Sequence, residues 1–229
     1  MNAQDIHVVG CGGVGGWLAQ CLTKMLGEND CLTLIDGDKF EDKNMDRQLH
    51  CAVGTNKANA LKRTLSRSSR CQIISDPVYF TEDGELPLIN ASSVLFCAAD
   101  NHPARLACLR TADTTGCLSI TCANGETDAE AYVYQSGWAG TKRDPRDYFP
   151  EISTDKRDDP LSPSCTGDEV LDTTPQLALA NMSAANYGMW LWFFWTTVAP
   201  HISDPEARAT FIHHLSSTAG RVHTQGIQS

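Results

Sequence analysis

The chain has 229 residues, of which 20% are charged and 41% are hydrophobic, and its formal net charge at pH 7 is −10. This composition excludes a disordered polypeptide, and the acidic balance argues against nucleic-acid binding, which usually requires a basic surface. We find no internal repeat and no linker that separates a second domain. We therefore expect a single domain over residues 1–229.

The 10 cysteines are interpreted as reduced thiols. Most of them fall in or beside apolar runs, where free cysteine behaves as a small hydrophobic residue. Residues 1–5 are polar and do not resemble a signal peptide, so we expect a cytoplasmic protein. No two cysteines have C-x-x-C spacing and the histidines have no ligand spacing, so we predict no zinc site.

The amino-terminal part predicts a strand, a glycine-rich turn and a helix. Residues 6–9 form an apolar run that suits a buried strand, and residues 14–26 have helical spacing. Between them, Gly10, Gly12 and Gly15 satisfy the G-x-G-x-x-G pattern of dinucleotide sites, and Asp36 follows about 20 residues later, where such sites bind a ribose. A turn of this kind lets the backbone and the positive end of the helix dipole approach a phosphate.

The following segments alternate between strands and helices. Strands are expected at residues 32–35, 71–75, 93–97 and 118–122, and a further, antiparallel one at 129–135. Helices are expected at residues 56–65 and 101–112, and residues 37–53 form a polar link that we expect to pack over a nucleotide. This alternation predicts an α/β fold with a doubly wound, mostly parallel sheet.

The polar residues of this region favour phosphate chemistry over hydride transfer. A nicotinamide enzyme needs the glycines and Asp36 but has no use for the polar side chains that follow, which are Asp38, Asn44, Arg47, Lys57 and Asp100. A site that attacks the α-phosphate of ATP needs a carboxylate for the ribose, cations for the phosphates and a carboxylate for a metal. Two plainer interpretations remain open: Lys57 as part of a solvated helix face, and Asp100 as a helix N-cap.

Taken together, these motifs resemble the ThiF/MoeB/HesA superfamily, whose adenylation domains are shared with ubiquitin-activating enzymes. The resemblance is carried by five motifs in the family's order: Gly10-x-Gly12-Gly13-x-Gly15, Asp36-x-Asp38, Asn44-x-x-Arg47-Gln48, Val53-Gly54-x-x-Lys57 and Asp100-Asn101-x-x-x-Arg105. It implies a Rossmann-like nucleotide-binding core over residues 1–135. It also implies ATP as substrate, with Asp36 on the ribose and with Asn44, Arg47 and Lys57 around the phosphates. Asp38 is expected to assist the metal or the ribose, and Asp100 to be the ligand of Mg²⁺.

Residues 136–170 are expected to form a long, charged crossover loop that ends in a candidate nucleophile. The segment Pro163-Ser164-Cys165-Thr166, followed by Pro175-Gln176, resembles the catalytic-cysteine segment of ubiquitin-activating enzymes. It also resembles ThiF-like proteins of the PRTRC type, for which a thioester does not follow. Cys165 is interpreted as the only cysteine in a polar, exposed setting, where a thiolate can form. The alternative is a packing cysteine.

Residues 171–229 are interpreted as a C-terminal helix and a terminal hairpin. Residues 177–199 are long enough to span a bilayer, but polar residues interrupt them and no basic residue flanks them closely, so we expect an interface helix and no membrane contact. By resemblance, the chain forms a homodimer or part of a heteromeric complex. The hairpin is expected at residues 210–215 and 221–225.

The resemblance implies an activating enzyme for a small ubiquitin-like (β-grasp) protein, bound through its C-terminal tail. Cys165 then holds this partner as a thioester, and a conjugating enzyme is a further candidate partner, in a bacterial ubiquitin-like conjugation system. Bacterial relatives usually supply an arginine from an N-terminal segment; none precedes Arg47 here, so we expect that cation from elsewhere or from another chain. Three alternative functions remain. The chain could be an activator of a sulfur-carrier protein without a catalytic cysteine, or the non-catalytic scaffold half of a heterodimer. A dinucleotide oxidoreductase is the least favoured of the three.

Overall fold

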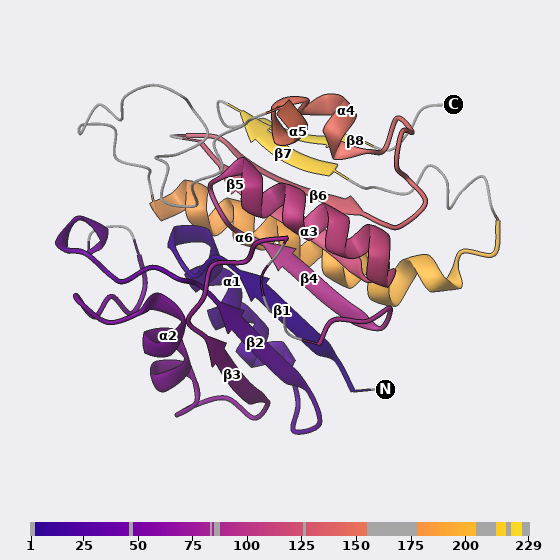
Figure 1. Cartoon of the computed structure of the whole chain (residues 1–229). Coiled ribbons are helices and arrows are strands. Elements are labelled where there is room, and N and C mark those ends of the chain that lie inside the picture. Colours follow the sequence, from indigo (N-terminus) through magenta and orange to yellow (C-terminus); the bar gives the residue numbers. More distant parts are fainter. Residues whose placement is uncertain are drawn as a thin grey trace.

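The structure is a computed structural model, and it describes residues 3–45, 48–82, 84, 88–125, 127–154, 178–204, 214–218 and 221–225. A single eight-stranded sheet has the order β3-β2-β1-β4-β5-β6-β7-β8 (Figure 1). Its strands are β1 (Asp5–Val9), β2 (Cys31–Ile35), β3 (Gln72–Asp76), β4 (Ser93–Cys97), β5 (Leu118–Asn124), β6 (Ala129–Tyr134), β7 (His214–Thr218) and β8 (Arg221–Gln225). The first five strands in this order, β3, β2, β1, β4 and β5, are parallel to one another. The remaining pairs, β5 with β6, β6 with β7 and β7 with β8, are antiparallel.

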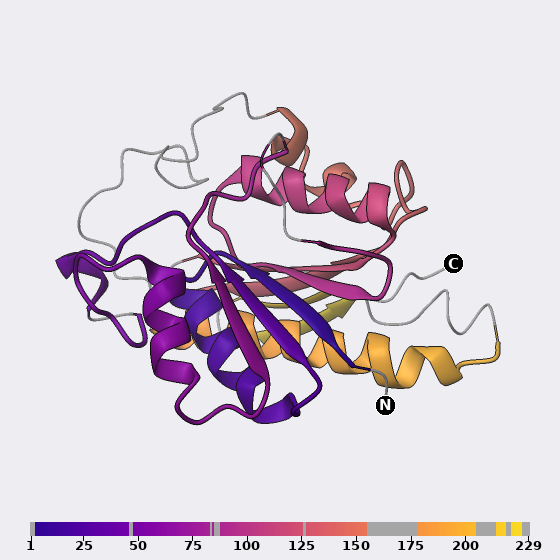
Figure 2. The same cartoon turned by 60° about the horizontal axis from the view of Figure 1, so that its bottom comes forward.

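Helices cover both faces of the sheet (Figure 2). One face carries α1 (Gly13–Met25), α2 (Lys57–Leu65) and α6 (Ala178–Phe193), and the other carries α3 (His102–Thr115) and α5 (Glu151–Thr154). The central strand β4 is buried along its whole length, as expected for a strand covered on both faces. The predicted mostly parallel, doubly wound α/β fold is therefore confirmed, including the antiparallel β6.

Local sequence signals set the helix ends near the site. Asn56 precedes α2 and its side chain accepts the N–H of Asn59 at 3.1 Å. Asn101 caps α3 in the same way through the N–H of Ala104, at 2.9 Å, and Gly116 ends α3 in a left-handed conformation with φ +76°. Because Asn101 is the N-cap, the alternative interpretation of Asp100 as the cap is wrong.

Two segments differ from the sequence-based expectation. Residues 136–154 are not irregular throughout, because they contain α4 (Pro145–Tyr148) and α5, and Ile152 is buried in the core beside α3. The terminal hairpin exists, but its first strand is β7 at 214–218 rather than 210–215, and residues 210–213 lie outside the described part. Within the described ranges, no helix is both long and apolar enough to cross a bilayer.

The carboxy-terminal helix continues beyond α6 in a wider and then a tighter winding. A π-helical turn covers Phe194–Val198, and a 3₁₀ turn covers Ala199–His201. The outer side of this helix is apolar and exposed at Leu179, Met182, Trp190 and Phe193, and Trp190 stacks on Phe194 with ring centroids 5.5 Å apart. An exposed aromatic surface of this kind suits an interface.

Candidate nucleotide site

The glycine-rich turn connects the carboxyl end of β1 to α1 and lies very close to β4. Gly10 has φ +86°, and a Cβ at this position would lie 2.8 Å from the carbonyl group of Ala98. The N–H of Gly10 donates to the Ile35 carbonyl at 2.9 Å, and the N–H of Ala98 donates to the Val9 carbonyl at 2.7 Å. A side chain at Gly15 would lie 1.8 Å from the Gly10 carbonyl oxygen. Contacts within the chain therefore require both of these glycines.

Gly12 is different, because the space beside it is open. The nearest atom to a Cβ at Gly12 would be Nε2 of Gln48, at an ordinary distance of 3.8 Å. Gly12 is the N-cap of α1, a 13-residue helix, and has no side chain that could cap it. No capping side chain therefore accepts a hydrogen bond from the first N–H groups of this helix. Oε1 of Gln48 is buried and has no hydrogen-bond partner among the described residues. The turn is therefore open to a phosphate at Gly12, next to an amide side chain.

Asp36 follows β2 and accepts two backbone hydrogen bonds. Its Oδ2 accepts the Cys11 N–H at 2.6 Å, and its Oδ1 accepts the Asp38 N–H at 2.8 Å. Burial raises the pKa of Asp36, and the nearby Lys57 charge and the two N–H groups offset this shift only in part. Each oxygen keeps lone-pair capacity for a ribose hydroxyl. The carboxylate is thus fixed beside the glycine turn, as the sequence predicts for a ribose ligand.

Lys57, the first residue of α2, lies close to both motif aspartates. Its Nζ donates to Asp38 Oδ2 at 3.0 Å, and only 12% of its side chain is exposed. Burial alone lowers the pKa of Lys57, but the charges of Asp36 and Asp38, with a contribution from Asp100, outweigh it and raise the pKa above its usual value. Lys57 is therefore charged at neutral pH, and its interpretation as a solvated helix face is wrong.

Two residues of this cluster, Tyr79 and Asn56, were not identified as site residues from the sequence. Tyr79 donates its hydroxyl to Asp38 Oδ1 at 2.8 Å, and its ring fills the space that a side chain at Gly37 would need. Asn56, besides capping α2, donates Nδ2 to the carbonyls of Asp36 at 2.7 Å and Asp38 at 3.0 Å. Asn56 could have been found as a residue directly before a helix, whereas nothing in the sequence pattern selects Tyr79.

The remaining motif residues have different surroundings. Asn44 is buried, and its Oδ1 accepts the Glu41 N–H at 2.9 Å within a capping box around the short 3₁₀ helix η1 (Asp42–Asn44). Asp100 is exposed at the carboxyl end of β4 and contributes to the raised pKa of Lys57. Arg47 and Cys165 lie outside the described residues. The phosphate role of Asn44 and the metal role of Asp100 stay predictions.

Two of the described cysteines, Cys11 and Cys21, differ in whether their thiols are accessible to a substrate. Cys11, in the glycine turn, is buried, and burial raises its pKa well above the usual value. Cys21 on α1 is exposed, so the expectation that only Cys165 has an exposed setting is wrong. Burial also raises the pKa of Cys21. No three His, Cys, Asp or Glu side chains within the described ranges come together as a metal site.

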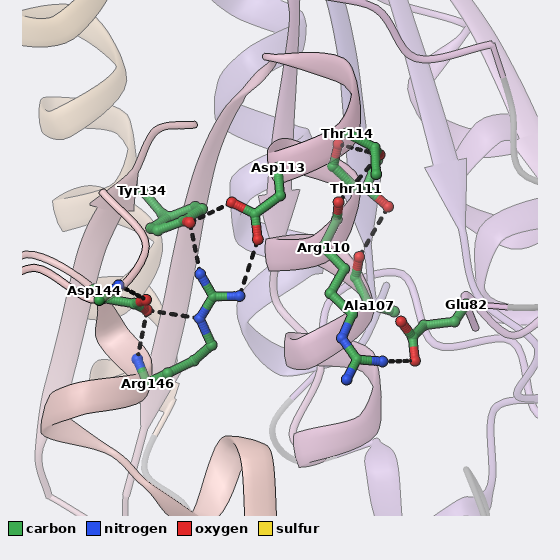
Figure 3. A network of polar contacts seen from close by, with 10 residues as sticks. Glu82, Ala107, Arg110, Thr111, Asp113, Thr114, Tyr134, Asp144 and Arg146 are labelled. Carbon is green, nitrogen blue, oxygen red and sulfur yellow. Dashed lines mark hydrogen bonds and ion pairs between the residues drawn. The ribbon is translucent and has the colours of Figure 1, made fainter. Parts of the chain in front are cut away.

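A second polar cluster, centred on Arg146, ties the start of the crossover to the domain (Figure 3). Nε of Arg146 donates to Asp144 Oδ1 at 2.8 Å, Nη1 to Asp113 Oδ2 at 2.9 Å, and Nη2 to the Tyr134 hydroxyl at 2.6 Å. The Tyr134 hydroxyl in turn donates to Asp113 Oδ1. Because Asp113 is on α3, Tyr134 on β6 and Asp144 before α4, one side chain joins three elements. No motif in the sequence indicated this cluster.

Comparison with known proteins supports the same family. The model of the ThiF family matches residues 1–198. Over 110 residues the chain is 36% identical to the mouse (Mus musculus) adenylyltransferase and sulfurtransferase MOCS3, a match that covers 46% of this chain and 23% of that protein. The chain therefore spans about a quarter of this curated relative.

Solved structures share the fold over nearly the whole chain. Escherichia coli MccB with ATP superposes with a TM-score of 0.61 at 20% identity, and PaaA with 0.65 at 18%; each match covers 98% of this chain and 64% of the other. MccB, described as a microcin C7 biosynthetic enzyme, was also solved with N-formylated MccA (TM-score 0.60, 19% identity, again 98% and 64%). At this identity the likeness establishes the fold.

Proposed function

Because this chain belongs to the ThiF family, we propose that it is an ATP-dependent adenylyltransferase that activates the C-terminal carboxylate of a polypeptide. One observation carries the proposal: a charged, nearly buried Lys57 lies beside Asp36 and next to a glycine turn that is open at Gly12. A dinucleotide oxidoreductase has no use for this cation. The MccB structure with ATP supports the choice of nucleotide. We assign the activity to a single domain over residues 1–229.

In this proposal, the phosphates of ATP lie at the amino end of α1 and the ribose hydroxyls bind Asp36. Lys57, Arg47, Asn44 and Gln48 surround the phosphates, and Asp38 orients Lys57 through the 3.0 Å ion pair. Asp100 suits Mg²⁺, because its exposed carboxylate follows the Ala98–Ala99 backbone that touches Gly10. When bound, Mg²⁺ would neutralise phosphate charge.

The first chemical step is attack of the partner's terminal carboxylate on the α-phosphorus. A bond forms between the carboxylate oxygen and this phosphorus, the bond to the bridging oxygen of the β-phosphate breaks, and pyrophosphate leaves with the negative charge. No general base is needed, because a carboxylate is ionised at neutral pH. The contribution of Lys57 and the α1 amino terminus is to position the phosphates and stabilise their charge.

A ubiquitin-like protein is the proposed partner, and Cys165 the proposed acceptor of its acyl group. The Cys165 thiolate attacks the acyl carbon, a thioester bond forms and AMP leaves. This assignment rests on the Pro163-Ser164-Cys165-Thr166 segment. The printed function of MOCS3, adenylyltransferase and sulfurtransferase, supports the alternative in which the adenylate is passed to a sulfur donor instead. An intact Lys57 and Asp100 argue against a scaffold without catalysis.

We further propose that the exposed side of α6 packs against a second copy of the chain. Leu179, Met182, Trp190 and Phe193 form this surface, and members of the resembled superfamily commonly form dimers. Replacement of Trp190 by glutamate should convert a dimer into a monomer in light scattering coupled to gel filtration. A wild-type chain that is monomeric at the same concentration would contradict this assignment.

Intact-mass analysis tests the acyl step. The chain is incubated with ATP, Mg²⁺ and a candidate ubiquitin-like protein, sought in a neighbouring reading frame, and its mass is measured before and after addition of a thiol reductant. We expect a reductant-sensitive adduct of the partner's mass that is absent in Cys165→Ala and present in Cys21→Ala, the matched control with the exposed thiol removed. Pyrophosphate release without an adduct would assign the sulfur-transfer alternative. If neither an adduct nor pyrophosphate were formed, the result would contradict the proposed adenylyltransferase activity.

A further inference from the structure

Asn181, on the first turn of α6, touches the glycine turn from the opposite end of the sequence. The residue is 1% exposed. A Cβ on Gly13 would lie 2.5 Å from Asn181 Nδ2 and 2.7 Å from both Cγ and Oδ1. Side-chain carbons do not approach other atoms this closely, and Gly13 does not have a positive φ. The absence of a side chain at Gly13 is therefore explained by the amide of Asn181, which occupies that space.

A polar side chain at this position is unusual for the helix that carries it. The other buried residues of α6 are alanine, glycine, methionine, leucine and tryptophan, so Asn181 is the one buried polar side chain among the described residues of this helix. Burying an amide in an apolar layer costs free energy unless the amide is well bonded. The exposed Asn186, on the same helix, lies in water and pays no such cost. Asn181 therefore stands out on α6 as a buried amide, and it lies at the contact with the first residue of α1.

The glycines of the turn differ in what fills the space beside them. Gly10 and Gly15 are required by backbone atoms of the turn and of Ala98–Ala99, within the first half of the chain. Gly12 faces open space next to Gln48. Gly13 alone of these four is in contact with the carboxy-terminal part of the chain. Gly13 is also the first residue of α1, so Asn181 contacts the turn at the helix end whose N–H groups would bind the phosphates.

We propose that Asn181 is a positioning residue of the nucleotide site: it holds the glycine turn and the first turn of α1 in place for the phosphates. The inference rests on the proposed function, because it requires ATP at this turn. Asn181 acts through Gly13 and contacts no reacting atom. It makes α6, which follows the segment that carries Cys165, a structural part of the nucleotide site.

The test is a cycle of variants titrated with a non-hydrolysable ATP analogue and Mg²⁺ in a calorimeter. Asn181→Ala should weaken binding about three- to tenfold, and Gly13→Ala by about tenfold or more, because its Cβ displaces the turn. In the double variant the alanine at 181 leaves room for this Cβ, so binding should return to the level of Asn181→Ala. The matched control Asn186→Ala should bind like the wild type. Thermal unfolding should show that Asn181→Ala is still folded at the titration temperature, so that its weaker binding does not come from unfolded protein.

Two results would overturn the inference. One is a double variant that binds as weakly as the product of the two single effects, which means that the two sites do not interact. The other is Asn181→Ala binding as well as Asn186→Ala, a comparison that holds even where Gly13→Ala fails to fold. A wild-type chain that does not bind the analogue would instead contradict the proposed function, so the two failures are distinguishable.

Discussion

Two clusters of this protein have the same composition and different surroundings. Each contains one cation, two aspartates and a tyrosine: Lys57 with Asp36, Asp38 and Tyr79 in the first, and Arg146 with Asp113, Asp144 and Tyr134 in the second. All three guanidinium nitrogens of Arg146 are bonded to its own cluster (Figure 3). Lys57, by contrast, is a compact charge on a flexible stem beside the turn that is open at Gly12.

This difference indicates how a binding site can be separated from a structural ion cluster. The planar fork of arginine fixes three elements at once and leaves little capacity for a ligand. The ammonium group of lysine has three rotatable donors and can bind both Asp38 and an incoming phosphate. We therefore assign ligand binding to the Lys57 cluster and stabilisation of the crossover to the Arg146 cluster. Variants of the two cations and of their partners therefore separate these two roles.

The largest expected effect is at Lys57. Lys57→Met should lower kcat/KM for partner-dependent pyrophosphate exchange by about 10²–10³, the range measured for loss of one preorganised charge-stabilising donor. Lys62→Met, on the same helix, is the matched control and should leave the rate unchanged. A Lys57→Met chain that exchanges pyrophosphate at the wild-type rate would remove Lys57 from the site.

The glycines should separate folding from binding. Gly15→Ala should prevent stable folding, because its Cβ would lie 1.8 Å from the Gly10 carbonyl oxygen. Gly12→Ala should keep the wild-type melting temperature but weaken ATP binding by about tenfold or more, because only a phosphate needs that space. Gly16→Ala is the control, since its Cβ would make an ordinary 3.8 Å contact with Leu49. Wild-type ATP affinity in Gly12→Ala would place the phosphates elsewhere.

Arg146→Met should show the reverse pattern, with a loss of stability rather than of binding. Removing the guanidinium takes the cation away from Asp113 and the buried Asp144, which keep only neutral donors, and breaking a buried ion pair costs about 3–5 kcal/mol. Urea unfolding measures this loss, and the ATP affinity of the folded variant should stay at the wild-type level. Weaker ATP binding at unchanged stability would contradict the separation of the two clusters.

The acid dependence of stability should also report on the second cluster. Burial alone would raise the pKa of Asp144, but hydrogen bonds from Arg146 and from the Gly140 and Arg146 N–H groups outweigh it and hold the pKa below the usual 3.8. The stability that Asp144 contributes is therefore present above pH 3.8 and is lost as the pH falls through the lower, folded-state pKa. Urea unfolding of wild type and Asp144→Asn should differ at pH 7 and converge in acid. A constant difference would exclude this linkage.

The smallest effects are expected from a matched pair of tyrosine variants. Tyr79→Phe removes one hydrogen bond to Asp38 and keeps the ring against Gly37, so KM for ATP should rise by a few-fold, in line with about 0.5–1.5 kcal/mol for one hydrogen bond. Tyr134→Phe removes two hydrogen bonds from the Arg146 cluster and should lower stability by about 1–3 kcal/mol with KM unchanged. Equal effects of both variants on KM would argue against separate roles.

The sequence predicted the parallel core and most of the nucleotide site because both depend on local patterns. Apolar runs between glycines and helical segments identified β1, β2 and β4, and the motif spacing placed Gly12, Asp36 and Lys57 at one edge of the sheet. Contacts between distant segments were missed: Tyr79 on Asp38, Asn181 on Gly13 and Arg146 on Asp113. In each pair the partners are far apart in sequence, and Tyr79, Asn181 and Arg146 belong to no motif of the resemblance, so only the folded chain brings them together.

Equilibrium titration with ATP and Mg²⁺ is the most direct test of the central assignment, using wild type, Lys57→Met and Arg146→Met, and with NAD⁺ as a second ligand. The account predicts that wild type and Arg146→Met bind ATP with the same affinity, that Lys57→Met binds it much more weakly, and that NAD⁺ does not compete. NAD⁺ binding by the wild type, or equal loss of ATP affinity in both variants, would contradict it.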